Sequence, residues 1–236
     1  MKFYPWVSIP VVAMVASASV HLPSAAAMPD AEKKVERSVE VFEEIMTDTG
    51  SRIPRKLLEQ SQGIAIIPGV VRAGFFLGGT RGGGVMVVRD PGGTWSNPAF
   101  INLTAGSIGL QIGAKSSDIV LVFKSRDAVN QFMTGSFKFG GSVSGTAGPI
   151  EASPVNPARG FKDAPIYTYA RSSGLFGGLS LEGTELSFDP ERNQRFYGKK
   201  LTPRQIFNDP FLNAPAVAES LKDTLEQAES GVLRRF

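Results

Sequence analysis

The feature that most constrains the fold is a succession of short apolar or alternating segments from residue 63 to residue 188, separated by Gly, Pro, Asn and Asp. Phe137 and Phe139 alternate with polar residues, which is the period of two that a half-buried strand shows. Gly and Pro stand where such strands would turn. The pattern predicts an antiparallel β-sheet in this part of the chain, with "RDPGGTW" at 89–95 as a hairpin turn.

Amphipathic helices are predicted on both sides of the strands. Val35, Val39, Phe42 and Ile45 follow one another at spacings of four, three and three residues, so they share one face of a helix. Further helices are predicted at 55–62 between Pro54 and Gly63, at 126–133 after Ser125, from 203 with a Thr202–Gln205 capping box, and at 217–228. The predicted class is α+β: a mainly antiparallel, strongly twisted sheet or barrel-like β core flanked by amphipathic helices at both ends.

The first 27 residues have the pattern of an export signal. Lys2 precedes an apolar run from Trp6 to Val20, and Ala25-Ala26-Ala27 supplies the small residues of a signal peptidase site. We predict a signal peptide at 1–27 and a single domain at 28–236, with a retained membrane anchor as the alternative. The expected location is periplasmic or extracellular, with peripheral attachment to a membrane. Because the chain has no Cys, neither a lipidated Cys nor a disulfide is expected.

The composition excludes several kinds of catalytic site. The only histidine, His21, lies in the predicted signal peptide, so a Ser-His-Asp triad, a Cys-His pair and the usual zinc sites are excluded from the mature chain. Carboxylate or lysine chemistry remains open, with Glu182, Glu185 and Asp189 as the nearest group of acids. A solvated strand and turn is the favoured interpretation of that group. We predict no enzyme activity, no catalytic residue, no metal site and no cofactor.

Two glycine-containing segments resemble phosphate-binding loops. "GLQIGAKS" at 109–116 has Ala114 where a P-loop needs its second Gly, and it lies in an alternating segment with no helix after it. "GFFLGGTRGGGVMVV" at 74–88 is bounded by apolar runs, which favours a hairpin loop or a close strand crossing. Arg81 at its centre leaves a phosphate contact open as the alternative.

The charges of the chain are balanced overall but unevenly distributed. Without Lys2 the mature chain would have 24 basic and 22 acidic residues, so no nucleic acid partner is expected. Residues 28–50 hold seven acids and three bases, whereas residues 51–90 hold six bases and two acids. Residues 192–204 hold five bases and no acid. The predicted surface therefore has separate acidic and basic zones.

Three blocks of the sequence resemble the SYLF domain family in the family's own order, from about residue 35 to residue 210. They contain W-S-x-P-A-F at Trp95 to Phe100, Q-x-G-A at Gln111 to Ala114, and S-x-G-L-F-G-G at Ser172 to Gly178. Trp95 itself is expected to be structural, covering the edge of the core with its indole N–H bonded to a carbonyl.

The resemblance implies a non-enzymatic domain that binds anionic membrane lipids, phosphoinositides in eukaryotic members, with actin bundling in some of them. An exported chain would meet no actin, so actin binding is not expected here. The basic N-terminal segment of some members is acidic in this chain, so the expected headgroup contacts lie elsewhere: Arg52, Arg55, Lys56, Arg72 and Arg81. A second basic group is Arg192, Arg195, Lys199 and Lys200. The alternative function is an envelope structural or stress protein that contacts a protein partner.

Overall fold

The computed structural model describes residues 29–48, 52–75, 77–108, 113–139, 146–147, 164–172, 175–177, 181 and 183–233. The predicted signal peptide lies outside these residues, as do Gln111, Ile112 and Glu182. Within them, no helix is both long enough and apolar enough to cross a membrane.

The described strands form one nine-stranded sheet with the order β5-β9-β3-β2-β1-β4-β7-β6, and β8 pairs with β7. The pairs are antiparallel except β6 with β7. The strands are β1 Gly63–Phe75, β2 Leu77–Val88, β3 Ala99–Ile108, β4 Gly113–Phe123, β5 Ser136–Lys138, β6 Thr146–Ala147, β7 Ile166–Ser172, β8 Leu175–Gly177 and β9 Thr184–Phe188. The sheet curls as a half-barrel, so the predicted α+β class is confirmed.

The described helices are α1 Asp30–Thr47, α2 Arg55–Glu59, α3 Arg126–Phe132, α4 Pro190–Tyr197, α5 Pro203–Asn208 and α6 Ala216–Ser230. The stripe predicted for α1 is confirmed, because Val35, Phe42 and Ile45 are fully buried and Val39 packs against them. The capping box of Thr202 and Gln205 and the Ser125 cap of α3 are also confirmed. Helix α4 was not predicted, although the Asp189 cap, Pro190 in the first turn and left-handed Gly198 at its end are typical helix signals.

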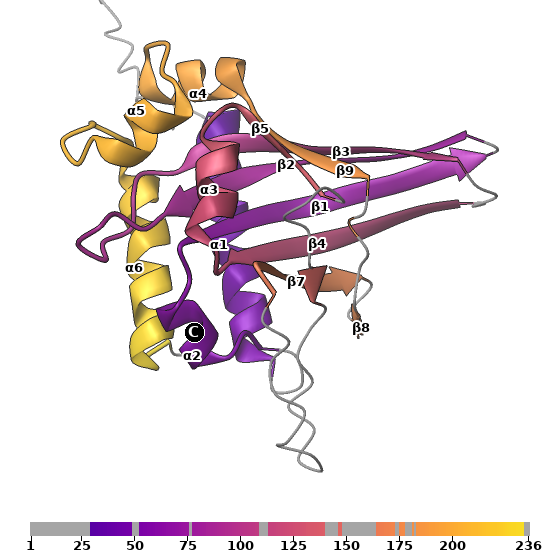
Figure 1. Cartoon of the computed structure of the whole chain (residues 1–236), viewed down its shortest axis with the longest axis horizontal. Coiled ribbons are helices and arrows are strands. Elements are labelled where there is room, and N and C mark those ends of the chain that lie inside the picture. Colours follow the sequence, from indigo (N-terminus) through magenta and orange to yellow (C-terminus); the bar gives the residue numbers. More distant parts are fainter. Residues whose placement is uncertain are drawn as a thin grey trace, which may run out of the picture.

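The helices cover only part of the sheet (Figure 1). Helix α1 lies behind the strands in this view, α3 lies in front, and α6 stands at the edge beside α1, while β1 to β4 extend beyond all of them. We call Gly63–Ile67 with its partners Val85–Val88 and Ile119–Phe123 the covered half. Val71–Phe75 with Leu77–Arg81 is the projecting half. Both pairings of β1 shift register between the two halves.

The helix predicted at 55–62 is shorter than expected. It ends at Glu59, Pro54 is its cap, and Gly63 is the first residue of β1 rather than a helix end. A side chain at Gly63 would come within 3.2 Å of Val129 and 3.3 Å of Met86. Close packing on distant residues, and not a helix terminus, accounts for this glycine.

The glycine cluster at 74–88 belongs to a hairpin, but most of its glycines lie inside β2. The hairpin closes at the Phe75–Leu77 pair. A Cβ on Gly84 would lie 2.1 Å from the carbonyl oxygen of Ile66, and one on Gly82 would lie 2.6 Å from Val70. These two glycines therefore let β2 approach β1 at its irregularity, which agrees with the predicted role in strand packing.

The predicted hairpin turn at 89–95 is confirmed. Asp90 donates its N–H to the carbonyl of Thr94, and Arg89 and Trp95 form a β-bridge. Trp95 is 3% exposed, as expected of a structural residue. Its indole N–H donates to the Glu229 carboxylate at 3.1 Å, not to a carbonyl, and the guanidinium of Arg89 lies 4.1 Å from its ring centroid. The C-terminal helix α6 is thus fastened to the hairpin.

Candidate functional site

Three of the five expected headgroup contacts lie together at one end of the molecule. Arg52 precedes α2, and Arg55 and Lys56 are its first two residues; all three are exposed. Leu57 and Leu58, on the other side of this short helix, are buried in the core and hold it in place. Arg55 is ion-paired with Glu59 at 3.0 Å, whereas Arg52 and Lys56 have no ion-pair partner within the described ranges. We call these three cations the α2 cations.

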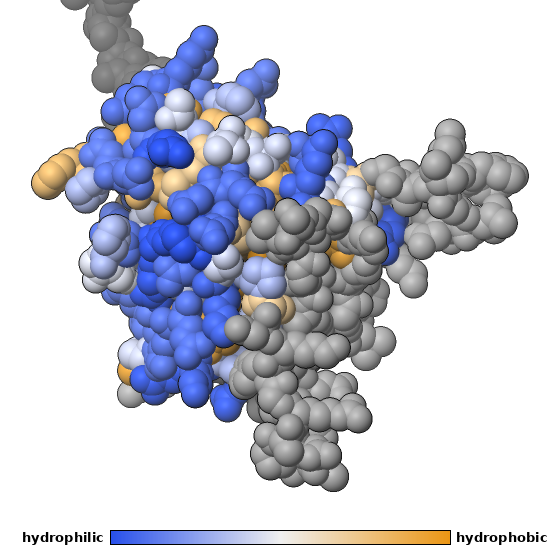
Figure 2. Space-filling view, viewed as in Figure 1, coloured by the Kyte–Doolittle hydropathy of each residue, from blue (hydrophilic) through white to orange (hydrophobic). Residues whose placement is uncertain are grey.

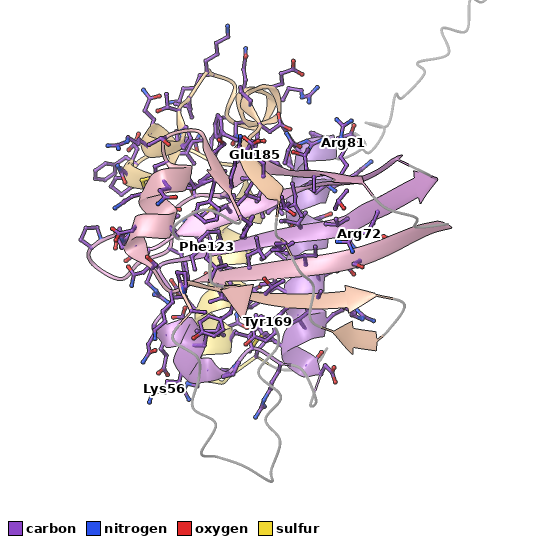
Figure 3. All side chains as sticks on the ribbon, turned by 45° about the vertical axis from the view of Figure 1, so that its right-hand side comes forward. Lys56, Arg72, Arg81, Phe123, Tyr169 and Glu185 are labelled. Carbon is purple, nitrogen blue, oxygen red and sulfur yellow. The ribbon has the colours of Figure 1, made fainter. Side chains whose placement is uncertain are left out.

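The other two expected contacts, Arg72 and Arg81, lie in the projecting half, far from the α2 cations (Figure 3). Strand β1 begins at Gly63, shortly after α2, and Arg72 lies nine positions further along it. Nine steps along a strand correspond to about 30 Å. Arg72 pairs with Thr80, and its Nε donates to the Thr80 hydroxyl at 3.3 Å. Arg81 pairs with Val71, so it points to the opposite face of the ribbon from Arg72. The structure therefore does not bring the five residues onto one surface.

A small pocket opens beside α2. It has a volume of about 190 Å³ and is lined by Lys56, Leu57, Gln60, Lys124 and Tyr167. Lys124 directly follows β4, and Tyr167 lies on the adjacent strand β7, where it pairs with Val122. The backbone N–H of Lys124 donates to the Pro165 carbonyl at 2.9 Å, which fixes the rim. The pocket therefore brings a second lysine next to one of the α2 cations.

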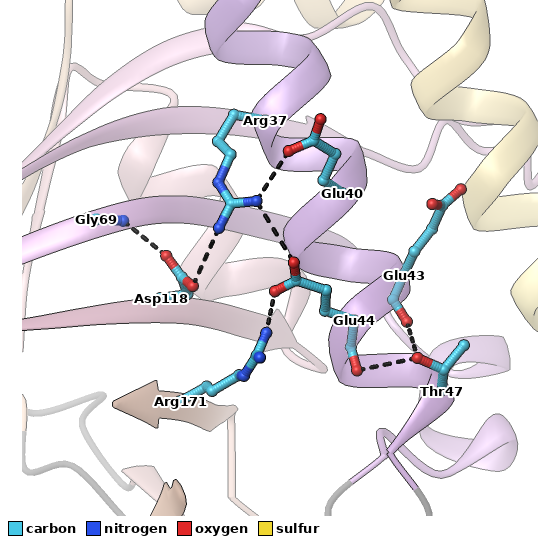
Figure 4. A network of polar contacts seen from close by, with 8 residues as sticks. All are labelled: Arg37, Glu40, Glu43, Glu44, Thr47, Gly69, Asp118 and Arg171. Atoms are coloured by element: carbon cyan, nitrogen blue, oxygen red, sulfur yellow. Dashed lines mark hydrogen bonds and ion pairs between the residues drawn. The ribbon is translucent and has the colours of Figure 1, made fainter. Parts of the chain in front are cut away.

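Two acids of α1, Glu40 and Glu44, belong to an ion-pair network that joins the helix to the sheet (Figure 4). Arg37 contacts Glu40 at 2.8 Å, Glu44 at 3.5 Å and Asp118 of β4 at 3.6 Å. Glu44 also pairs with Arg171 of β7. The hydrogen bond that the Arg37 guanidinium donates to the Glu40 carboxylate raises the pKa of Arg37. This network spans α1, β4 and β7 and pairs the guanidinium groups of Arg37 and Arg171 with carboxylates of the same protein.

Two members of the second basic group lie beside acids of α1. Arg192 and Arg195 line one pocket with Asp30 and Glu32, and Arg192 also pairs with Asp189 at 3.6 Å. Lys199 and Lys200 are exposed on the turn between α4 and α5.

Of the acids considered for catalysis, Asp189 accepts the cap bond from the Arg192 N–H and Glu185 faces Lys138 at 3.9 Å. Both described carboxylates thus have structural partners.

One aromatic side chain stands out on the surface. Phe211, in the turn between α5 and α6, is 92% exposed. The next residue, Leu212, is buried, and the side chain of Asn97 donates to its carbonyl at 2.8 Å. Figure 2 shows a mostly hydrophilic surface over the helices, so this aromatic is an isolated exception.

Comparison with known proteins agrees with this architecture. The family model described as "Ysc84: Las17-binding protein actin regulator" matches residues 104–228. The chain belongs to this family, the SYLF family. It is 36% identical over 170 residues to LAS seventeen-binding protein 3 of Saccharomyces cerevisiae, covering 70% of this chain. It is 33% identical over 198 residues to the human SH3 domain-containing YSC84-like protein 1, covering 82% of this chain.

The chain corresponds to only part of the length of these relatives. The matched region is 36% of the length of the yeast protein and 57% of the human one. The chain is also 35% identical over 177 residues to Protein YSC84 of Saccharomyces cerevisiae, and the matched region is 37% of the length of that protein. The family resemblance expected from the three sequence blocks is confirmed, whereas the binding partners of those longer proteins are properties of those proteins.

Proposed function

We propose that this SYLF protein is a non-enzymatic, peripheral lipid-binding protein of the cell envelope that recognises anionic phospholipid or phosphoinositide-like headgroups. The observation that carries the proposal is the exposed group of α2 cations at one end of the fold, anchored by two buried leucines. Basic residues near an anionic bilayer each contribute about 1 kcal/mol of attraction. The description of the matching family model refers to an actin regulator, but export through the predicted signal peptide would separate this chain from actin.

The charges of the surrounding elements favour the α2 cations as the contact with an anionic membrane. Two acids of α1, Glu40 and Glu44, are paired with arginines of α1 and β7, and Glu59 is paired with Arg55. Arg52 and Lys56 therefore keep most of their attraction for an anionic surface. Because the attraction is Coulombic, it decays over a Debye length of about 8 Å at physiological ionic strength.

Vesicle flotation with neutral and anionic liposomes tests the proposal. We expect the protein to float with anionic vesicles at low salt and to lose much of this binding at high salt. Neutralising the α2 cations as Arg52→Gln, Arg55→Gln and Lys56→Gln should weaken binding by about 100-fold, since three charges of about 1 kcal/mol each are removed. The fold should persist, because exposed charges contribute little to stability.

A matched control neutralises the two arginines of the projecting half, Arg72→Gln and Arg81→Gln. If only this control loses binding, the headgroup contact lies in the projecting half, and its assignment to the α2 cations is wrong. If both variants lose binding, both ends contribute, as the sequence predicts. No flotation of the unaltered protein on anionic vesicles at low salt would contradict the lipid-binding function itself.

The alternative function, contact with an envelope protein, is favoured by one observation, the exposure of Phe211. A phenyl ring held in water by a well-anchored turn is a typical contact residue of protein interfaces. A photocrosslinking amino acid at position 211 in living cells tests this. A single protein adduct would favour the protein partner, and an adduct with lipid alone would assign the residue to membrane contact.

A further inference from the structure

A groove runs between helices α1 and α6. Its volume is about 530 Å³, within the range of about 300–1,000 Å³ that ligand sites occupy. On α1 its lining extends from Glu32 to Glu40, and eight steps of helix correspond to about 12 Å. Helix α6 contributes Ala216, Val217 and Ser220. The groove is therefore long enough to receive a segment of chain rather than a single small group.

The floor of the groove is apolar. Val39 of α1 and Val217 of α6 are only partly buried, and both pack against the hydrophobic core. Ala216 and Ser220 are small and exposed, which leaves space beside the valines. Apolar side chains placed in this space would remove the remaining surface of both valines from water, which is favourable. The groove thus fits a partner with an apolar stripe.

The rim of the groove on α1 is negatively charged. Glu32, Glu36 and Glu40 follow one another at spacings of four residues, so they form a row on one face of the helix. The described lining contains these carboxylates and no basic side chain. Glu40 is paired with Arg37 at 2.8 Å, whereas Glu32 and Glu36 have no ion-pair partner among the described residues. Two carboxylates are therefore available to a cationic partner.

The helix itself does not require this row of glutamates. Glu32 lies in the first turn, where an acid interacts favourably with the helix dipole, but Glu36 lies beyond that turn. Like charges four residues apart destabilise a helix. Burial and the neighbouring charge of Glu40 raise the pKa of Glu43, so the repulsion continues along α1. A positively charged partner would relieve it.

The spacing of the carboxylates favours an extended cation over a metal ion. In the part of the chain that the structure describes, no three Asp, Glu, His or Cys side chains form a group that could hold a metal. Successive glutamates of the row are about 6 Å apart along the helix, and Lys or Arg residues one turn apart on a second helix repeat at the same distance. An amphipathic helix that lays its apolar face into a groove is a common mode of recognition.

We propose that the groove between α1 and α6 binds a cationic amphipathic helix of another protein. The apolar stripe of that helix covers Val39 and Val217, and its Lys or Arg residues pair with Glu32 and Glu36. The groove lies towards the start of α1, whereas the α2 cations follow the end of this helix. The inference therefore does not depend on lipid binding.

The probe is a fluorescent helical peptide of leucine and lysine only, with the leucines on one face, and its binding is followed by fluorescence anisotropy. We expect saturable binding that weakens as salt is added, because the ion pairs are exposed to solvent. Glu32→Gln with Glu36→Gln should weaken it by about tenfold. The matched control, Asp223→Asn with Glu226→Gln, removes the same charge from exposed positions of α6 outside the lining and should change binding by less than about twofold.

Two further arms test the groove itself. A peptide with alanine in place of leucine keeps the charge and the helix, and should bind at least about tenfold more weakly because the apolar contact is lost. Ser220→Lys, at an exposed position of the lining, places a cation in the groove and should abolish binding. Thermal unfolding shows whether each variant keeps the fold, and the alanine peptide needs no variant at all.

Three outcomes would overturn the proposal. The first is that the leucine–lysine peptide does not bind the unaltered protein. The second is an equal loss in the glutamate variant and its control, or equal binding of the alanine peptide, since the peptide would then respond to net charge alone. The third is a glutamate variant that changes the sedimentation of the protein by itself and not peptide binding, which would assign the groove to a second copy of this chain. Vesicle flotation decides the lipid-binding function separately.

Discussion

The two halves of β1 belong to one continuous strand and yet lie in opposite environments. In the covered half, Ile64, Ile66 and Ile67 are at most 1% exposed, although neighbouring residues of a strand point to opposite faces. In the projecting half, Val71 is 45% exposed and Arg81 lies open to solvent. The ladder to β2 and β4 continues through both halves, apart from the shift near residues 67–70.

The difference shows that hydrogen bonding to neighbouring strands does not decide where the hydrophobic core lies. Core formation follows the helices, because α1 and α3 cover only one half of the sheet, and α6 packs beside α1 at the same end (Figure 1). The energy of folding should therefore be concentrated in the covered half, and charged residues can be carried by the projecting half at little cost.

The largest effect is expected for Trp95→Ala at the edge of the covered half. This change removes a nearly fully buried indole and its hydrogen bond to Glu229, and should lower the free energy of unfolding by about 3–5 kcal/mol. Val71→Ala in the projecting half serves as the comparison and should change it by less than about 0.5 kcal/mol. Urea unfolding followed by circular dichroism measures both. Similar losses in the two variants would contradict the comparison.

The next effect concerns two glycines of the same strand, β2. Gly84→Ala should destabilise by about 1–3 kcal/mol or more, because its Cβ would lie 2.1 Å from the Ile66 carbonyl oxygen and 2.7 Å from the Cα of Ile67. At Gly79 the nearest described atom would be the Ala105 carbonyl oxygen at 3.6 Å, an ordinary contact. Gly79→Ala should thus leave the melting temperature nearly unchanged. Equal tolerance of both alanines would mean that β2 does not approach β1 closely.

Much of this fold could be predicted from local sequence signals. The apolar stripe of α1, the caps of α3 and α5 and the hairpin at 89–95 all depend on residues close together in the chain. The role of Gly63 cannot be predicted locally, because it is set by Val129 and Met86, which are distant in sequence. Helix α4, by contrast, has local signals in Asp189, Pro190 and Gly198.

The candidate site was predicted only in part. The α2 cations lie within five consecutive residues, so the local sequence is enough to identify them as a group. Lys124 and Tyr167 could not be assigned to the same pocket, because only the pairing of β4 with β7 brings them together. The opposite orientation of Arg72 and Arg81 depends on where the hairpin turns, since a slip of one residue would move a side chain to the other face.

A smaller effect is expected where the two halves meet. Asp118 accepts the Gly69 N–H at 2.8 Å and faces Arg37, while Glu44 pairs with Arg171, so charged groups join α1 to the irregular part of β1. Because these side chains are about one third exposed, Arg171→Gln should cost no more than about 1 kcal/mol and less at high salt. A double-mutant cycle with Glu44→Gln measures the coupling. A coupling that salt does not change would contradict a screened ion pair.

The smallest effect is a pH dependence at Glu229, the acid beneath Trp95 and Arg89. Burial raises the pKa of Glu229, and this outweighs the opposing effect of Arg89. A carboxyl with a raised pKa in the folded state takes up its proton more readily there than in the unfolded chain. Its stabilising effect is therefore fully present below the unfolded pKa of about 4.3 and is lost as the pH rises through the folded value.

Glu229→Gln removes this titration and isolates it from the other carboxylates. We expect the free energy of unfolding of the unaltered protein, measured relative to Glu229→Gln in urea at a series of pH values, to fall as the pH rises from about 4 to 7. A rise of the relative stability with pH would mean that the Arg89 ion pair outweighs burial. The site of Glu229 at the edge of the covered half would then tolerate a charge better than its low exposure suggests.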